Sequence, residues 1–245
     1  MNDVAALADG HWQWNGWLDP KGRVQALFAL LRVDAETLWL VTTADDAFDT
    51  ALSRFIFRSK VRIGALPLQT SGALRTPAAA RGATFARDGD SVELDLSADG
   101  GARTLRLAPG SAQPSPAGEA AWWRLDIVHG WPAVPGARLA DWTPQQLSLQ
   151  RLHAFSVKKG CYPGQEIVAR THFLGRAKRG LARVRAAGAK AGDVVHDAGG
   201  RDVGAIVACV GDEALAVLPL EPADASYRLG DATIDRLTFE DGLSR

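Results

Sequence analysis

A cysteine lies in an unusual loop, Lys159-Gly160-Cys161-Tyr162-Pro163-Gly164-Gln165-Glu166, which we call the cysteine loop. Two glycines and a proline within five residues impose a sharply shaped backbone. Residues 165–171 are expected to begin a short helix. A thiol that precedes a helix N-terminus, beside Lys158 and Lys159, has its thiolate favoured electrostatically. We therefore expect Cys161 to be solvent-accessible and more acidic than the reference thiol, whose pKa is about 8.5.

Such a thiolate is suited to soft, reversible chemistry: transient coordination of iron, or mixed-disulfide exchange with a client protein. A stable metal site is not expected, because the second cysteine, Cys209, lies in an apolar run and is interpreted as core. A Cys161–His172 pair is conceivable, although the histidines show no metal-ligand spacing. The residues alone favour equally an inert loop whose cysteine merely packs.

Charge and composition narrow the class of protein. Lys plus Arg and Asp plus Glu number 28 each in 245 residues, so the formal net charge is zero. No global field attracts the chain to nucleic acid or a membrane surface; we expect no direct DNA binding, and an RNA contact would need a local patch. Two cysteines in different settings suggest a reducing compartment. No signal pattern or membrane-spanning run of roughly 20 apolar residues occurs, so we expect a cytoplasmic protein without a membrane partner.

Apolar periodicity in the first half predicts a mixed fold. Runs at 13–18 and 23–33, separated by Asp19-Pro20-Lys21-Gly22, predict a β-hairpin, and 37–41 predicts a third strand. The helical spacing from Ala44 to Ser59 predicts a helix capped by Thr43, with Asp45 and Asp46 in its first turn. A strand is expected at 61–65. Strands with one helix of this kind indicate an α+β unit.

The second half changes in texture. Residues 92–96 and 103–107 predict a hairpin, 109–118 a loop, and 122–128 a further strand. After Gly175, short apolar runs are separated by glycine-containing turns at 199–200 and 211–212. Several short strands with tight turns predict a small β-barrel or sandwich.

The cysteine loop resembles the Lys-Gly-Cys-Tyr-x-Gly-Gln-Glu signature of the YgfZ family of folate-binding proteins, relatives of the glycine-cleavage aminomethyltransferase. An eight-residue match is far more specific than a lone glycine motif. The similarity extends to flanks and upstream segments, while residues 66–120 match poorly and look shortened. The matching segments are Leu149–Val157, Ile167–Arg170, Gly175–Leu181, Trp14–Phe28 and Phe55–Ile63.

The resemblance implies an α+β fold in which ferredoxin-like, aminomethyltransferase folate-binding modules precede a C-terminal β-barrel. We expect residues 1–175 to form the folate-binding region and 176–245 the barrel. The family's pattern begins with a strand ahead of the segment matched by Asn2–Val4. That strand and a folate-contacting tryptophan are thus expected to be missing, and we expect a mis-set start or a truncation rather than a dispensable strand.

The resemblance also implies a function: a folate-binding accessory protein that supports iron–sulfur enzyme assembly or maintenance and tRNA modification. Its cofactor would be tetrahydrofolate or a derivative, and its protein clients would be iron–sulfur enzymes. Trp122 matches a family tryptophan associated with folate and would stack on the pterin, while Arg170 would contact the folate. The cysteine loop would lie at the mouth of the same opening, with Lys159, Gly160, Cys161, Tyr162, Gly164, Gln165 and Glu166 as its site residues.

Two alternatives remain. A tetrahydrofolate-dependent aminomethyltransferase would need an acid where Ala26 and Leu27 stand, and general acid–base catalysis is worth roughly 10²–10⁴-fold. The pterin-gripping Glu of that enzyme is likewise replaced, at Val128 and His129. The other alternative is an interaction scaffold in which neither folate nor the thiol matters.

Overall fold

The computed structural model describes residues 1–44, 47–111, 113, 115–175, 177–222 and 225–245. Strands β1 (His11–Leu18), β2 (Val24–Arg32) and β3 (Leu38–Thr42) form an antiparallel sheet in the order β1-β2-β3. The turn between β1 and β2 is closed by Asp19, whose Oδ1 accepts the backbone N–H groups of Lys21 and Arg23. The predicted hairpin and third strand are confirmed.

Helix α1 (Ala47–Ser53) is shorter than the expected helix, and no strand forms at 61–65. Asp45 and Asp46 of the expected first turn lie outside the described residues. Most helical stability in proteins comes from packing an apolar face. Beyond Ser53 that face is poorly buried, since the Phe55 side chain is 59% exposed. The expectation of one helix from Ala44 to Ser59 is therefore wrong.

A second sheet contains β4 (Gln69–Ala73), β5 (Ala86–Asp88), β6 (Ser91–Asp95) and β7 (Thr104–Ala108), in the order β4-β7-β6-β5. The predicted hairpin is confirmed as β6–β7, whereas β4 and β5 were not expected.

Helix α2 (Pro116–His129) stands where a strand was expected at 122–128, so that expectation is wrong. The residues at the two ends of this segment explain why it is helical. Ser115 Oγ accepts the Gly118 N–H, Pro116 occupies the first turn, and Gly130 ends the helix with φ 73°. These signals also shorten the expected loop at 109–118, because the helix begins inside it.

Two short 3₁₀ turns, η1 (Leu139–Asp141) and η2 (Leu149–Leu152), lead to α3 (Gln165–Phe173), which confirms the helix predicted after the cysteine loop. A closed barrel follows, in the order β10-β11-β8-β13-β12-β9. Its strands are β8 (Arg179–Arg185), β9 (Val194–Asp197), β10 (Asp202–Val210), β11 (Glu213–Pro219), β12 (Tyr227–Leu229) and β13 (Ala232–Leu237).

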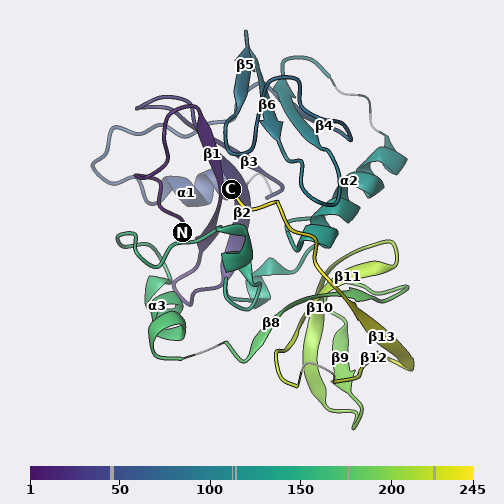
Figure 1. The fold of residues 1–245 in the computed structure, drawn as a ribbon. Helices are drawn as coiled ribbons and strands as arrows, with labels where there is room; N and C mark the ends of the chain where they lie inside the picture. The colour runs from purple at the N-terminus through teal and green to yellow at the C-terminus, as the bar shows by residue number, and fades with distance from the viewer. Residues whose placement is uncertain (45–46, 112, 114, 176, 223–224) are drawn as a thin grey trace.

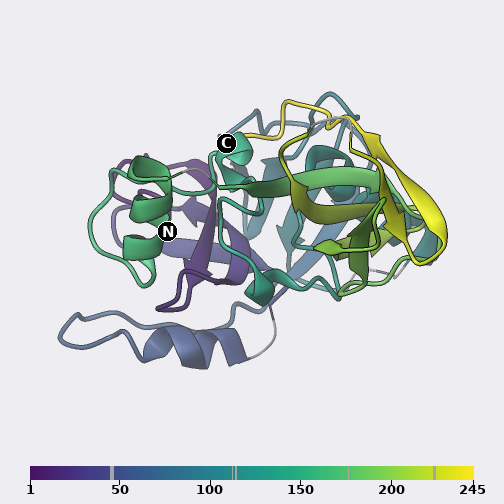
Figure 2. The ribbon, with the colours of Figure 1, turned by 90° about the horizontal axis from the view of Figure 1, so that it is seen from below.

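The predicted α+β class with a C-terminal barrel is thus confirmed. The exact division between 175 and 176 stays a prediction, because residue 176 lies outside the described residues. Figures 1 and 2 show the barrel beside the β1–β3 sheet, with α2 above it and α3 at the far side of the sheet in Figure 1. The last residues return from the barrel to the sheet, where Trp14 Nε1 donates to Leu243 O over 2.7 Å. In the described parts of the chain, no helix has the length and apolarity needed to cross a membrane.

Candidate functional site

The cysteine loop is seated on the turn between β1 and β2. Gly164 has φ 75°, and a Cβ at this position would lie 2.5 Å from Asp19 O and 2.6 Å from Gly22 Cα. Both atoms belong to backbone, which has little freedom to yield. Gly22 approaches Ile167 of α3 in the same way, with 3.0 Å between its ideal Cβ and that of Ile167. Only glycine fits this contact, so Gly164 sets where α3 begins.

Tyr162 and Gln165 close the loop from inside. Tyr162 N–H donates to Gln165 Oε1 over 3.1 Å, and Gln165 N–H donates to Tyr162 O over 3.2 Å. The Tyr162 hydroxyl donates to Ser156 O, and Lys159 Nζ lies 5.3 Å from the Tyr162 ring centroid, at cation–π distance. Burial raises the pKa of Tyr162 above its usual range. The ring is therefore a neutral anchor for the loop.

Cys161 is exposed at the tip of this anchored loop, while Cys209 is partly buried against the barrel core. Gly160 is open, with no atom within 4 Å of its ideal Cβ. Glu166 and Arg170 form an exposed ion pair along α3, 3.1 Å apart. His172 lies in the last turn of α3, roughly 10 Å along the axis from its first residue at 1.5 Å per residue, and no hydrogen bond joins it to Cys161 among the described residues.

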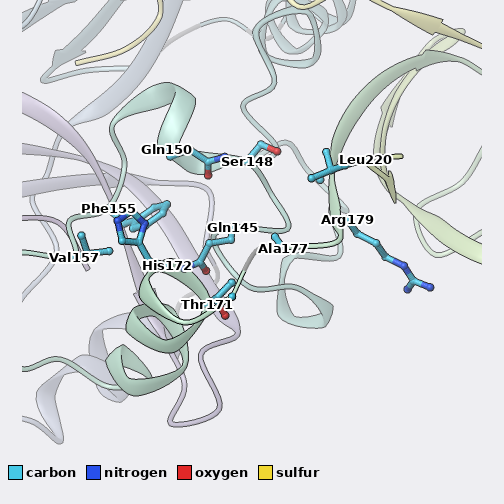
Figure 3. Close-up of a pocket in the computed structure, with 12 residues that line it drawn as sticks. Gln145, Ser148, Gln150, Phe155, Val157, Thr171, His172, Ala177, Arg179 and Leu220 are labelled. Carbon is cyan, nitrogen blue, oxygen red and sulfur yellow. The ribbon is translucent and has the colours of Figure 1, made fainter. Parts of the chain in front are cut away.

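A pocket of about 440 Å³, called here the α3 pocket, lies beside the end of this helix. Figure 3 shows its side chains, which come from segment 145–157, from the last turn of α3 and from the start of β8. The walls are largely apolar, with Phe155 and Val157 at one end and Leu220 at the other. Gln145 Nε2 donates to Val168 O over 2.8 Å, whereas its buried Oε1 has no partner among the described residues.

Strained backbone shapes this pocket. Ser148 and His153, which flank η2, have φ 50° and 54°, a region that costs non-glycine residues of order 1–3 kcal/mol. Buried Leu149 and Leu152 hold η2 in place, and Ser148 Oγ accepts the Leu181 N–H of β8 over 3.0 Å. Strain of this kind persists where surrounding contacts enforce it, and it clusters at functional sites.

Trp122 is in neither the α3 pocket nor the cysteine loop. A Cβ on Gly72 of β4 would lie 2.5 Å from Trp122 Cε3, and the Arg103 guanidinium lies 5.0 Å from the ring centroid. Arg124, two residues after Trp122 in α2, pairs with Glu213 at the start of β11. Leu220 of the pocket follows the other end of that strand, roughly 20 Å from Glu213 at 3.3 Å per residue. The α3 pocket is lined by neither Trp122 nor the cysteine loop, so their expected common opening and any folate contact by Trp122 stay predictions.

The positions compared with the aminomethyltransferase are internal. Ala26 and Leu27 are buried in β2, and Val128 and His129 are buried at the end of α2. His129 Nδ1 lies 2.7 Å from Leu125 O, and its Nε2 accepts the Gly100 N–H over 3.3 Å. Within the described ranges, no group of three or more His, Cys, Asp or Glu residues is placed to hold a metal ion.

Sequence reasoning missed Gln145 and Ser148, for which no local pattern exists. Phe155 and Val157 lie in the segment Leu149–Val157, whose resemblance to the family was the signal that could have placed them near the site. Thr171 lies near the cysteine loop in sequence but was not assigned to a pocket.

No family model matches this chain. It is 30% identical over 203 residues to tRNA-modifying protein YgfZ of Klebsiella pneumoniae (strain 342), covering 73% of this chain and 62% of that protein. It is likewise 30% identical over 202 residues to tRNA-modifying protein YgfZ of Vibrio vulnificus (strain YJ016), covering 76% and 62%. The chain thus spans less than two thirds of the length of these curated relatives.

Among solved structures, the crystal structure of glycine cleavage system aminomethyltransferase T from Bartonella henselae superposes with a TM-score of 0.69. The alignment covers 95% of this chain and 75% of that one at 15% identity, so it shows a shared fold.

Proposed function

Because this chain is a homologue of the YgfZ proteins with the fold of aminomethyltransferase T, we propose that it is a folate-binding accessory protein in tRNA modification. The observation that carries the proposal is the seated cysteine loop: Gly164 locks it onto the β1–β2 turn while Cys161 stays exposed at its tip. Exposed thiols on fixed loops are suited to contact with another protein.

The α3 pocket is the site that we assign to tetrahydrofolate, on its volume and its lining. Its volume of about 440 Å³ lies within the usual range of small-molecule pockets, roughly 300–1,000 Å³. Gln145 Oε1 would accept from the pterin amino group, which satisfies a buried acceptor that otherwise lacks a partner. Phe155 offers an apolar face, and Arg179, whose side chain extends away from the others in Figure 3, would meet the glutamate carboxylates. Bound there, tetrahydrofolate would supply one-carbon chemistry.

The proposed task of Cys161 is exchange with iron–sulfur client enzymes. Its thiolate would attack a client disulfide, forming a mixed disulfide and releasing one client thiolate, or would coordinate iron transiently. The matched control is Cys209, which is partly buried in the barrel.

Folate binding is tested by titrating the protein with tetrahydrofolate in a calorimeter. Arg179→Gln removes a charged hydrogen-bond donor and should weaken binding about 10-fold or more; Gln145→Met removes a neutral acceptor and should weaken it about 5-fold. Gln25→Met, on an exposed position of β2, should leave the Kd unchanged. Weakening by Trp122→Phe alone, with the pocket variants silent, would move the site to α2. No saturable binding by the unaltered protein would end the folate proposal.

The thiol is tested separately, by complementation of a bacterium that lacks its own YgfZ, with modified tRNA nucleosides measured by mass spectrometry. Cys161→Ser should lower tRNA modification without changing folate affinity, whereas Cys209→Ser should restore it. Full restoration by a Cys161→Ala, Trp122→Ala double variant would favour the scaffold alternative. Turnover with an aminomethyl-lipoyl carrier would favour the aminomethyltransferase alternative, which the buried Ala26 and Leu27 speak against.

A further inference from the structure

A segment that we call the arm, residues 54–66, leaves the body of the protein after α1. Phe55 N–H bonds to Leu52 O and Ile56 N–H to Ser53 O, which ends the helix. From 57 to 66, no backbone hydrogen bond joins the arm to any other described residue. Figure 2 shows α1 and this segment at the lower edge of the molecule, apart from the β1–β3 sheet. The arm is therefore held at its base and free along its length.

The arm carries positive charge alone. Its four cations are Arg54, Arg58, Lys60 and Arg62, and no acidic residue occurs between Asp49 and Asp88. None of the four forms an ion pair with a described residue. In a chain of zero net charge, this is a local field strong enough to attract a polyanion.

Aromatic side chains alternate with these cations. Phe57 is 85% exposed and Phe55 is 59% exposed. The Phe55 ring still meets the Trp17 ring edge-on, with centroids 5.8 Å apart, so it ties the arm to the sheet. The Arg58 guanidinium lies 5.2 Å from the Phe57 ring centroid. An exposed phenyl ring beside a guanidinium forms a surface onto which a planar base can stack.

This pattern distinguishes among polyanions. Helices that lie on membrane surfaces place cations and apolar residues on opposite faces. The arm is not helical, with a turn at 54–55 and a bend at 57–59, and its cations and aromatic residues are interleaved, which is the arrangement that binds phosphates and unpaired bases together. A duplex would occupy the cations but leave Phe57 without a base to contact.

We propose that the arm binds single-stranded RNA, with its four cations on successive phosphates and Phe57 stacked on an unpaired base. The choice of RNA rests on the proposed function in tRNA modification. The contact itself rests on the charge, exposure and aromatic spacing of the arm.

The test is fluorescence anisotropy with a labelled single-stranded RNA of roughly 12 nucleotides, within the site sizes of such proteins. Four phosphate contacts predict a slope of about −2.8 in log affinity against log salt, or an affinity loss of about 50-fold between about 50 mM and about 200 mM salt. Arg58→Gln/Lys60→Gln should reduce the slope to about −1.4, and the loss to about 7-fold. Arg185→Gln/Lys190→Gln, which removes the same charge from exposed positions in the barrel region, should change neither value.

Phe57→Ala separates stacking from charge. It should weaken binding about 5- to 150-fold at constant salt while leaving the slope unchanged. The 85% exposure of this ring means that the fold should survive, and circular dichroism checks this.

The proposal is overturned if the RNA does not bind at low salt, or if the barrel-region control weakens binding as much as the arm variant does. Sedimentation of the protein with phosphatidylglycerol vesicles, in the absence of RNA binding, would assign the arm to membranes instead. Tetrahydrofolate titration of the same arm variants distinguishes the two proposals. If the unaltered protein binds folate but not RNA, only the proposal for the arm fails. If it binds RNA but not folate, only the proposal for the α3 pocket fails.

Discussion

Replacing Gly164 by Ala should displace the cysteine loop from the β1–β2 turn. The alanine would have to keep φ near 75°, which costs L-residues roughly 1–2 kcal/mol. Its Cβ would also overlap Asp19 O at 2.5 Å and Gly22 Cα at 2.6 Å, and overpacking of this kind costs about 1–3 kcal/mol. Together these effects predict a loss of about 2–5 kcal/mol, a large share of the roughly 5–15 kcal/mol that stabilises a typical protein.

Gly160→Ala is the matched control in the same loop. Gly160 does not have a positive φ, and its ideal Cβ meets no atom within 4 Å, so the change should stay within about 0.5 kcal/mol. Urea unfolding measures the global free energy. Amide hydrogen exchange over 160–173 measures opening of the loop, and there Gly164→Ala should accelerate exchange at least about 30-fold. Equal behaviour of the two variants would show that the loop is not seated as described.

Three further outcomes are expected. Iodoacetamide should label Cys161 before Cys209 in the folded protein, read by mass spectrometry, and the reverse order would contradict the exposed loop. Asp126→Asn should lower the free energy of unfolding in urea by about 3–5 kcal/mol, because it leaves the buried guanidinium of Arg103 unpaired. Glu166→Gln, which breaks the exposed ion pair with Arg170, should lower it by less than about 1 kcal/mol. Equal losses in the two variants would contradict a larger role for the buried pair. Burial lowers the pKa of His129, so below about pH 6.5 the unfolded state binds a proton that the folded state does not, and the free energy of unfolding should fall as the pH drops. His129→Gln should make the urea midpoint less dependent on pH in this range. An unchanged pH profile in the variant would contradict this expectation.

Local patterns were sufficient where neighbours in sequence are also neighbours in space. The Asp19–Gly22 turn, the barrel turns at 199–200 and 211–212 and helix α3 each depend on side chains within a few residues, and each was predicted, whereas the β12–β13 hairpin was not. The strand expected at 122–128 failed because its apolar residues carry no decisive period, whereas the Ser115 cap and the Gly130 terminus specify a helix. The expected helix through Ser59 failed for a different reason: its apolar face finds too little to pack against.

Some features of the candidate site were also predictable from the sequence, and others were not. The sequence by itself determined the cysteine loop, because Pro163 fixes its own φ and the glycines allow the positive φ that Gly164 adopts. It also determined that Ala26 and Leu27 carry no acid. Only the tertiary structure decided that Gly164 abuts the β1–β2 turn, some 140 residues earlier in the chain.

The α3 pocket likewise exists only in three dimensions. It gathers side chains near 145, 172 and 179 because η2, strained at both ends, lies between α3 and the first barrel strand. Trp122, by contrast, was proposed because it matches a family tryptophan, and the fold packs it between Gly72 and Arg103. Residue types are written in the sequence, but which of them share a cavity depends on packing between distant segments, and no short-range pattern encodes that packing.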